Sequence, residues 1–243
     1  MNSASIGVPE LKRPGTPSCT APTVFVVDDD VSVRESLQSM LFSTGRHVET
    51  FTSAREFLER ERPRVPSCLV LDVNLPDLNG LELQRRIVAS GVVGSIPIVF
   101  ITGFGDVRTS VRAMKAGAVE FLQKPLDEDA LLVAIEDALE RSEAALALRD
   151  ESDALLERYA SLSVRERDVM WLVIRGKLNK QVGAELGISE ITVKAHRGRV
   201  MRKMRADSLA DLVVMAGRLG ERLTSIAGVR NPHVAVSGSA SRR

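Results

Sequence analysis

The sequence predicts an α/β first domain, built on a doubly wound sheet of five parallel strands, and a second, all-α domain. Residues 22–140 alternate short apolar runs with amphipathic segments, the pattern of a parallel sheet covered by helices. Residues 161–222 show only helical periodicity. The first stretch is acidic, with 12 basic and 19 acidic residues and a net charge of −7, whereas the second has 13 and 7 and a net charge of +6. Two domains with different partners are therefore expected.

Five short runs rich in Val, Ile and Phe are the expected strands of the first domain. Few of their positions are polar, which suits strands that helices cover on both faces. We expect these strands at residues 23–27, 47–50, 67–72, 96–102 and 120–123.

Amphipathic segments between these runs predict the helices. The first helix is expected to begin near Ser32, because Ser32 and Glu35 have the spacing of a capping box, and Asp30 is expected to cap it or to lie in solvent. Strands that alternate with helices in this way favour a doubly wound parallel sheet. Further helices are expected at residues 54–59, 81–89, 107–116 and 131–139.

The remaining segments of the chain frame the two domains. Residues 1–21 are polar and proline-containing and predict a disordered leader, and residues 223–243 predict a loose tail. Residues 141–160 contain neither Pro nor Gly and predict a helical linker. No apolar run is long enough to span a bilayer, and the N-terminus lacks the apolar core of a signal peptide. We therefore expect a cytoplasmic protein without a membrane partner.

The second domain has the pattern of a helix-turn-helix. Helices are expected at residues 164–174, 179–186, 190–204 and 209–219, with Asn179 and Ser189 as helix caps. A short helix, a turn at Gly187 and a longer helix rich in Arg and Lys form the pattern. On the longer helix we expect Ile191, Val200 and Met204 to face the core.

Charged and hydroxyl side chains follow the predicted strands of the first domain. Asp28 and Asp29 follow the first strand, Asp72 the third, Thr102 the fourth and Lys124 the fifth. Ligand sites of such sheets lie at the carboxyl ends of the strands. Carboxylates are ligands that Mg²⁺ prefers, and a carboxylate beside a cation can attack phosphorus. Asp72 is the best candidate nucleophile, because it ends the most apolar strand.

Four motifs, VFVVDDD, LVLDVNLPDLNGLEL, PIVFITG and FLQKPL, resemble in this order the receiver domain of two-component response regulators, which has a flavodoxin-like fold. The resemblance implies that a sensor histidine kinase phosphorylates Asp72. It implies that Mg²⁺ is held by Asp28, Asp29, Asp72 and the backbone carbonyl of Asn74. It further implies switch roles for Thr102 and Phe121, pairing of Lys124 with the phosphoryl group, and a cis peptide bond at Pro125.

The stretch LSVRERDVMWLVIRGKLNKQVGAELGISEITVKAHRGRVMRKM (162–204) resembles the LuxR-type helix-turn-helix, so the whole chain resembles the NarL/FixJ group of response regulators. The resemblance implies that phosphorylation drives homodimerisation through residues 105–140 and controls binding to double-stranded DNA, with RNA polymerase as a further partner. TVKAHRGRVMRKM would be the recognition helix in the major groove. The expected DNA-binding residues are Lys180, Thr192, Lys194, Arg197, Arg199 and Lys203, of which Lys194 and Arg197 are the candidates for base contacts. Ala195 and Gly198 stand where relatives often carry larger side chains.

Two other functions remain open from the residues. A Mg²⁺-dependent phosphohydrolase could use Asp72 covalently, although Asn74 stands where such enzymes commonly need a second carboxylate. The helix-turn-helix could instead contact RNA polymerase, as sigma-like regions do. We expect a transcription factor rather than an enzyme.

Overall fold

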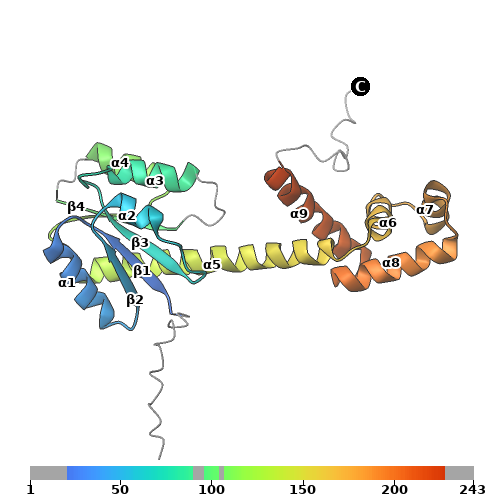
Figure 1. Cartoon of the computed structure of the whole chain (residues 1–243), viewed down its shortest axis with the longest axis horizontal. Helices are drawn as coiled ribbons and strands as arrows, with labels where there is room; N and C mark the ends of the chain where they lie inside the picture. The colour runs from blue at the N-terminus through green and yellow to red at the C-terminus, as the bar shows by residue number, and fades with distance from the viewer. Residues whose placement is uncertain (1–20, 90–95, 104–106, 228–243) are drawn as a thin grey trace, which may run out of the picture. The chain divides into compact units, whose positions relative to one another are not determined.

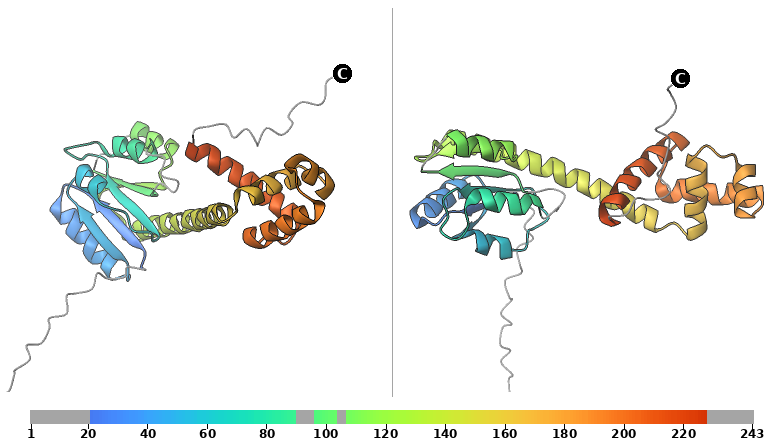
Figure 2. Two further views of the ribbon diagram at one scale, coloured as in Figure 1. Left: turned by 45° about the vertical axis from the view of Figure 1, so that its right-hand side comes forward. Right: turned by 90° about the horizontal axis from the view of Figure 1, so that it is seen from above.

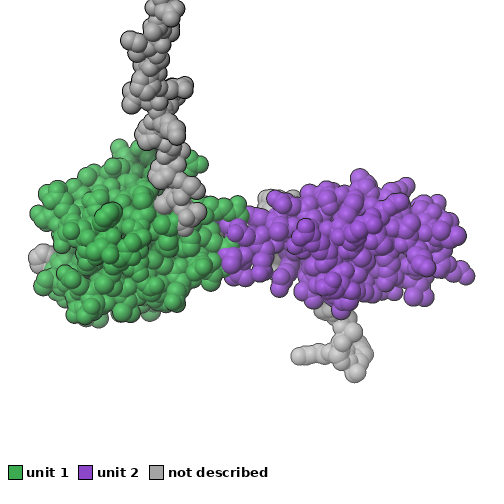
Figure 3. All heavy atoms as spheres, turned by 90° about the horizontal axis from the view of Figure 1, so that it is seen from below, with its two compact units in different colours: residues 1–146 green, residues 147–243 purple. Residues whose placement is uncertain are grey.

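The computed structural model describes residues 21–89, 96–103 and 107–227, with side chains up to residue 220. The chain divides into two compact units, residues 1–146 and 147–243 (Figure 3). The predicted leader lies outside the described residues except for Ala21, and so does the predicted tail beyond residue 227.

The first unit contains a five-stranded parallel sheet in the order β2-β1-β3-β4-β5 (Figure 1). This order confirms the predicted doubly wound sheet. It also places β1 and β3 side by side at the point where the strand order reverses, which is where ligands bind in open α/β sheets. The strands are β1 (Thr23–Val27), β2 (His47–Phe51), β3 (Ser67–Asp72), β4 (Ile98–Thr102) and β5 (Glu120–Gln123).

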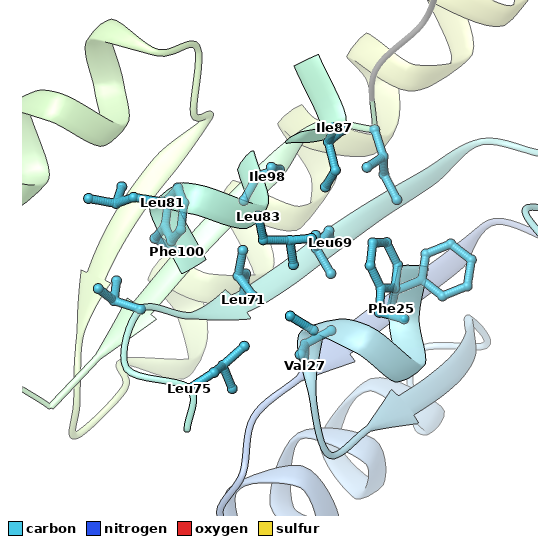
Figure 4. Close-up of a cluster of buried hydrophobic side chains, with 14 of the residues drawn as sticks. Phe25, Val27, Leu69, Leu71, Leu75, Leu81, Leu83, Ile87, Ile98 and Phe100 are labelled. Carbon is cyan, nitrogen blue, oxygen red and sulfur yellow. The ribbon is translucent and has the colours of Figure 1, made fainter. Parts of the chain in front are cut away.

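Helices cover both faces of this sheet (Figures 1 and 2). Side chains of β1 alternate between the two cores, as the period of a strand requires: Val24 and Val26 pack on one face, and Phe25 and Val27 on the other. The first face is covered by α1 (Val31–Phe42) and the start of α5 (Glu128–Ala160). The second face, drawn in Figure 4, is covered by α2 (Ala54–Glu59), α3 (Gly80–Ala89) and α4 (Val107–Lys115).

The first helix begins earlier than predicted. Asp30 is its N-cap, and its carboxylate accepts a hydrogen bond of 2.8 Å from the backbone N–H of Ser32. The predicted capping box of Ser32 and Glu35 is therefore wrong, because Ser32 already lies inside the helix. Asp30 has the capping role that separates it from Asp28 and Asp29.

A single 33-residue helix, α5, includes both the predicted helix at 131–139 and the linker at 141–160, which is helical as predicted. Its first turns bury Leu131, Ile135 and Leu139 against the sheet. The hydroxyl of Ser142 accepts a hydrogen bond of 3.0 Å from the backbone N–H of Ser67, which explains a polar residue on an otherwise apolar stripe.

The last turns of α5 belong to the second unit. Leu155 lies in the core of that unit, and Tyr159 packs against the same core. The second compact unit begins at residue 147 and so includes part of the predicted linker.

The second unit contains four further helices within the described residues: α6 (Val164–Ile174), α7 (Asn179–Leu186), α8 (Glu190–Met204) and α9 (Leu209–Ala227). Ser163 and Glu166 form a capping box at the start of α6, and Ser189 caps α8 as predicted. The N-cap of α7 is Leu178, so the prediction that Asn179 caps this helix is wrong. Residues 223–227, predicted as tail, are part of α9.

The buried face of α8 differs from the prediction at one position. Val200 and Met204 are buried as expected, but Ile191 is 83% exposed. Val193 is fully buried in its place and packs with Val169 and other residues of α6 and α7.

None of the helices that the structure describes has the length and apolar character needed to cross a membrane.

Candidate functional site

Three carboxylates meet at the carboxyl edge of the sheet. Asp28 directly follows β1 and Asp72 ends β3, and these two strands are hydrogen-bonded neighbours. Asp28 is fully buried, Asp72 is 4% exposed, and Asp29 lies in solvent. Oxygen atoms of the three side chains lie within 4.8 Å of one another. The structure therefore brings together three of the side chains that the sequence assigned to one site.

Lys124 lies between two of these carboxylates. Its Nζ donates a hydrogen bond of 2.7 Å to Asp28 Oδ2 and lies 3.4 Å from Asp72 Oδ1. Burial alone would lower the pKa of Lys124, but the hydrogen bond to Asp28 and the charges of Asp28 and Asp72 outweigh burial, and the pKa is raised. Lys124 is therefore an ammonium ion held against the acidic cluster.

Asp72 has a raised pKa, chiefly because burial disfavours its charged form. Lys124 and the backbone N–H of Asn74 oppose this effect, whereas the charge of Asp28 adds to it. The hydrogen bond from Asn74 N to Asp72 Oδ2 measures 3.1 Å. Asp72 Oδ1, by contrast, is buried and has no hydrogen-bond partner. The Lys124 ammonium, 3.4 Å away, faces this oxygen without a hydrogen bond to it.

The side chains of this cluster fit a divalent cation. The cluster contains three carboxyl groups and one ammonium, and a buried carboxylate oxygen without a hydrogen-bond partner is costly unless a further positive group approaches it. Mg²⁺ prefers such oxygen ligands and completes its coordination with water. Asn74, the fourth predicted ligand, lies beside Asp72 in the loop after β3.

The predicted switch residues lie on the two neighbouring strands. Thr102 is fully buried at the end of β4, and its carbonyl accepts a hydrogen bond of 2.8 Å from Lys124 N. Phe121 on β5 is half-buried, with its ring 6.2 Å from that of Phe100. The peptide bond between Lys124 and Pro125 is cis, as the sequence predicted.

Backbone contacts that were not predicted from the sequence hold this edge in place. Arg34 Nη1 donates a hydrogen bond of 2.7 Å to the carbonyl of Asp28. Gly80 lies so close to the loop after β3 that a Cβ on it would come within 2.6 Å of the carbonyl oxygen of Asp72. Asp77, from the same loop, accepts hydrogen bonds from the backbone N–H groups of Ala54 and Arg55 at the start of α2. Only the contacts of Asp77 join residues more than 20 positions apart, but all three depend on how the loops fold and not on a sequence motif.

The second unit presents a basic surface along α8. Lys180, Lys194 and Arg199 are exposed. Arg197 is half-buried, and its Nη1 donates a hydrogen bond of 3.3 Å to Asn179 Oδ1 on α7. The hydroxyl of Thr192 lies 2.8 Å from that of Ser189 at the start of the helix.

Lys203, predicted to contact DNA, pairs with groups of its own unit. Its Nζ donates hydrogen bonds to Glu166 Oε2 at 2.6 Å and to the carbonyl of Ser161 at 3.0 Å. The hydrogen bonds to Glu166 from Lys203 and from the backbone of Ser163 lower the pKa of Glu166 to about 2. The ammonium thus joins the end of α8 to the start of α6, and the DNA contact of Lys203 stays a prediction.

The first unit has an acidic cluster and a lysine at the carboxyl edge of a five-stranded parallel sheet, and a helix-turn-helix follows in the second unit. This arrangement is typical of a signal-dependent regulator with a receiver domain and an output domain. Residues 24–136 match the response regulator receiver domain, and residues 160–216 match the bacterial regulatory proteins of the luxR family.

Several known proteins are similar over most of the chain. Nodulation protein W of Bradyrhizobium diazoefficiens is 50% identical over 84% of this chain and 89% of its own length. The transcriptional regulatory protein FixJ of the same species is 42% identical over 81% of this chain and 95% of its own. The solved structure of response regulator StyR is 50% identical, covers 82% of this chain and 99% of its own, and superposes with a TM-score of 0.72.

The chain belongs to the response regulators that join a receiver domain to a LuxR-type DNA-binding domain. It is a response regulator transcription factor, and control by phosphorylation is consistent with this family.

Proposed function

We propose that Asp72 is the phosphoacceptor of this regulator. The observation that supports this assignment is the buried Asp72 Oδ1, which lacks a hydrogen-bond partner and lies 3.4 Å from Lys124 Nζ. In the transfer, an oxygen of the Asp72 carboxylate forms a bond to phosphorus while the bond from phosphorus to the imidazole nitrogen of the donor histidine breaks. Lys124 is placed to pair with the negative charge on the transferred group.

Asp28, Asp29, Asp72 and the backbone carbonyl of Asn74 would hold Mg²⁺. When bound, Mg²⁺ neutralises charge on the oxygens of the phosphoryl group. Asp28 is fully buried and already hydrogen-bonded to Lys124 and to the backbone N–H of Asp30, so it orients the ammonium as well as contributing an oxygen.

A sensor histidine kinase is the proposed phosphoryl donor. A groove of about 300 Å³ adjoins the site between α1 and the start of α5, and Lys124 and Pro125 form part of its wall. Its apolar lining includes Val33, Met40 and Leu126. A partner that delivers a phosphoryl group to Asp72 would dock in this groove, whose wall includes Lys124 of the acidic cluster.

Intact mass measurement tests the phosphoacceptor. Incubation with acetyl phosphate and Mg²⁺ should add one phosphoryl group to the full chain, and a chelator should abolish the gain. The Asp72→Asn variant should gain none, whereas Asp30→Asn, which retains a side chain able to cap α1, should behave as the wild type. An equal gain by Asp72→Asn would show that another residue is the nucleophile.

Phosphorylation would shift Thr102 and Phe121 and drive formation of a homodimer through α4, β5 and α5. The exposed stripe of α4 supports this proposal: Val107, Val111 and Met114 are 78%, 44% and 43% exposed and follow helical spacing. Light scattering should show a dimer after treatment with acetyl phosphate, and Val111→Asp should remain monomeric. Val88→Asp, an exposed site on α3, is the matched control. A phosphorylated Val111→Asp dimer would argue against this surface.

The second unit would place α8 in the major groove, with Lys194 and Arg197 near base edges and Lys180, Thr192 and Arg199 at phosphates. The exposure of Lys180, Lys194 and Arg199 supports these assignments.

RNA polymerase is a further proposed partner, and a chain that acts on DNA in this way would work in the cytoplasm. The phosphohydrolase alternative requires turnover, so continuous release of nitrophenol from p-nitrophenyl phosphate would revive it.

A further inference from the structure

The exposed side chain of Ile191 on the first turn of α8 lies where a base-reading residue is expected. It is 83% exposed, the most exposed large apolar side chain among the described residues. A single exposed apolar side chain needs no explanation on most surfaces, but this one stands on a helix that also exposes the cations Lys194, Arg199 and Arg202. Its position on α8 therefore decides what it can contact.

The outward face of α8 is defined by its buried face. Val193, Val200 and Met204 are buried on one side of the helix. The opposite side follows the spacing i, i+4, i+7 and i+11, with 3.6 residues per turn. It comprises Ile191, Ala195, Gly198 and Arg202, all exposed, with Lys194 and Arg199 beside them.

Two small residues on this face permit a close approach to a partner. A Cβ built on Gly198 would meet no atom within 4 Å, so nothing in the described part of the chain requires glycine there. A glycine inside a helix costs about 1 kcal/mol relative to alanine. The small side chains leave room for an external surface to approach this face, and the flanking cations Lys194 and Arg199 match the charge of a DNA backbone.

We propose that Ile191 reads thymine by packing against its 5-methyl group in the major groove. This inference rests on the proposed insertion of α8 into DNA. The N-terminal residues of a recognition helix contact base edges, and the 5-methyl of thymine is the one apolar group that a base pair presents in the major groove. Isoleucine has no donor or acceptor, so it distinguishes thymine from cytosine and uracil only through that methyl group.

Replacing thymine by deoxyuridine removes only this methyl group. A binding sequence is first selected from random duplex DNA with the full chain treated with acetyl phosphate and Mg²⁺. Duplexes are then made in which each thymine of the selected site is replaced singly by deoxyuridine. At one thymine of each half-site, wild-type affinity should fall about fourfold, the effect of losing one buried methyl group.

The Ile191→Ala variant completes the cycle. It should bind the thymine duplex about as weakly as the wild type binds the uracil duplex, and should show no further loss on uracil substitution at that position. Val164→Ala, at a 73% exposed valine on the first turn of α6, should keep the fourfold penalty. Since Ile191 is exposed, Ile191→Ala should melt at the wild-type temperature.

Three results would overturn the inference. Either insensitivity of the wild type to every uracil substitution, or an unchanged penalty in Ile191→Ala, would show that Ile191 contacts no thymine methyl. Unchanged DNA affinity of Ile191→Ala, with loss of transcription in a purified system, would assign the side chain to RNA polymerase. Failure to select any sequence would instead overturn the proposed DNA recognition itself.

Discussion

Replacing Gly80 by alanine should slow phosphorylation at the acidic site, although the substitution changes none of its carboxylates. A Cβ on Gly80 would lie 2.6 Å from the carbonyl oxygen of Asp72 and 3.2 Å from Phe100 Cε1, whereas ordinary contacts begin at 3.4 Å. The oxygen is backbone and cannot rotate away, so the loop after β3 or the start of α3 must move by about 0.8 Å to restore an ordinary contact, the difference between those two distances.

Two effects of known size follow from that displacement. Overpacking of this kind costs about 1–3 kcal/mol of folding free energy. A misplacement of roughly 1 Å can slow a reaction on the order of 100-fold, because Asp72 must meet phosphorus in line. We therefore expect phosphoryl gain from acetyl phosphate to slow by at least tenfold, and the first unit to melt several degrees lower.

The assay follows phosphoryl gain by intact mass at intervals and unfolding of the first unit by circular dichroism. Gly103→Ala is the matched control, since Gly103 directly follows Thr102 at the same edge and a Cβ there meets nothing within 4 Å. The control should react at the wild-type rate. A Gly80→Ala protein with wild-type rate and melting temperature would refute the reasoning that this glycine positions Asp72.

Three other expectations can be checked with the purified chain. The pKa of Glu166 is about 2 in the folded protein against 4.5 in the unfolded chain, so its ion pair stabilises the second unit above pH 4.5, and this stabilisation is lost as the pH falls towards 2. At pH 7, Glu166→Gln should therefore be less stable than the wild type by about 1–3 kcal/mol, and the difference should shrink in acid. The fluorescence of Trp171, the single tryptophan, reports the unfolding. Burial raises the pKa of the Cys68 thiol to about 12, so in a Cys19→Ser background Ellman's reagent should label the unfolded chain and leave the native chain unlabelled. Lys194→Ala should reduce the salt dependence of DNA binding by about one unit of slope if Lys194 contacts a phosphate, or relax sequence preference if it contacts a base, whereas Lys203→Ala should act on the stability of the second unit.

The acidic site could be predicted from the sequence because parallel strands bring their carboxyl ends to one edge. Asp28 and Asp72 are far apart in sequence, yet each follows an apolar run, and strand ends of one sheet meet. The ion pair of Lys124 with Asp28 was not predicted. The sequence offered Lys124 only as a partner of the phosphoryl group, and its pairing before phosphorylation depends on side-chain geometry.

The second unit was harder to predict in detail. Ile191 and Val193 are both apolar and lie two residues apart, so composition alone does not say which faces the core; packing against α6 and α7 selects Val193. Lys203 looked like any basic residue of a DNA-binding helix. Its partner Glu166 lies 37 residues earlier, and only the tertiary fold brings the two together.

The last turns of α5 determine at which residue a fragment must begin to contain the whole output domain. Tyr159 accepts a hydrogen bond of 3.2 Å from the indole nitrogen of Trp171, and the guanidinium of Arg167 lies 5.0 Å from the centre of its ring. A fragment that begins at residue 161 loses both contacts together with Leu155 of the core. A fragment that begins at residue 147, where the second compact unit starts, retains them. DNA affinities measured on the shorter fragment would therefore describe a domain with an incomplete core.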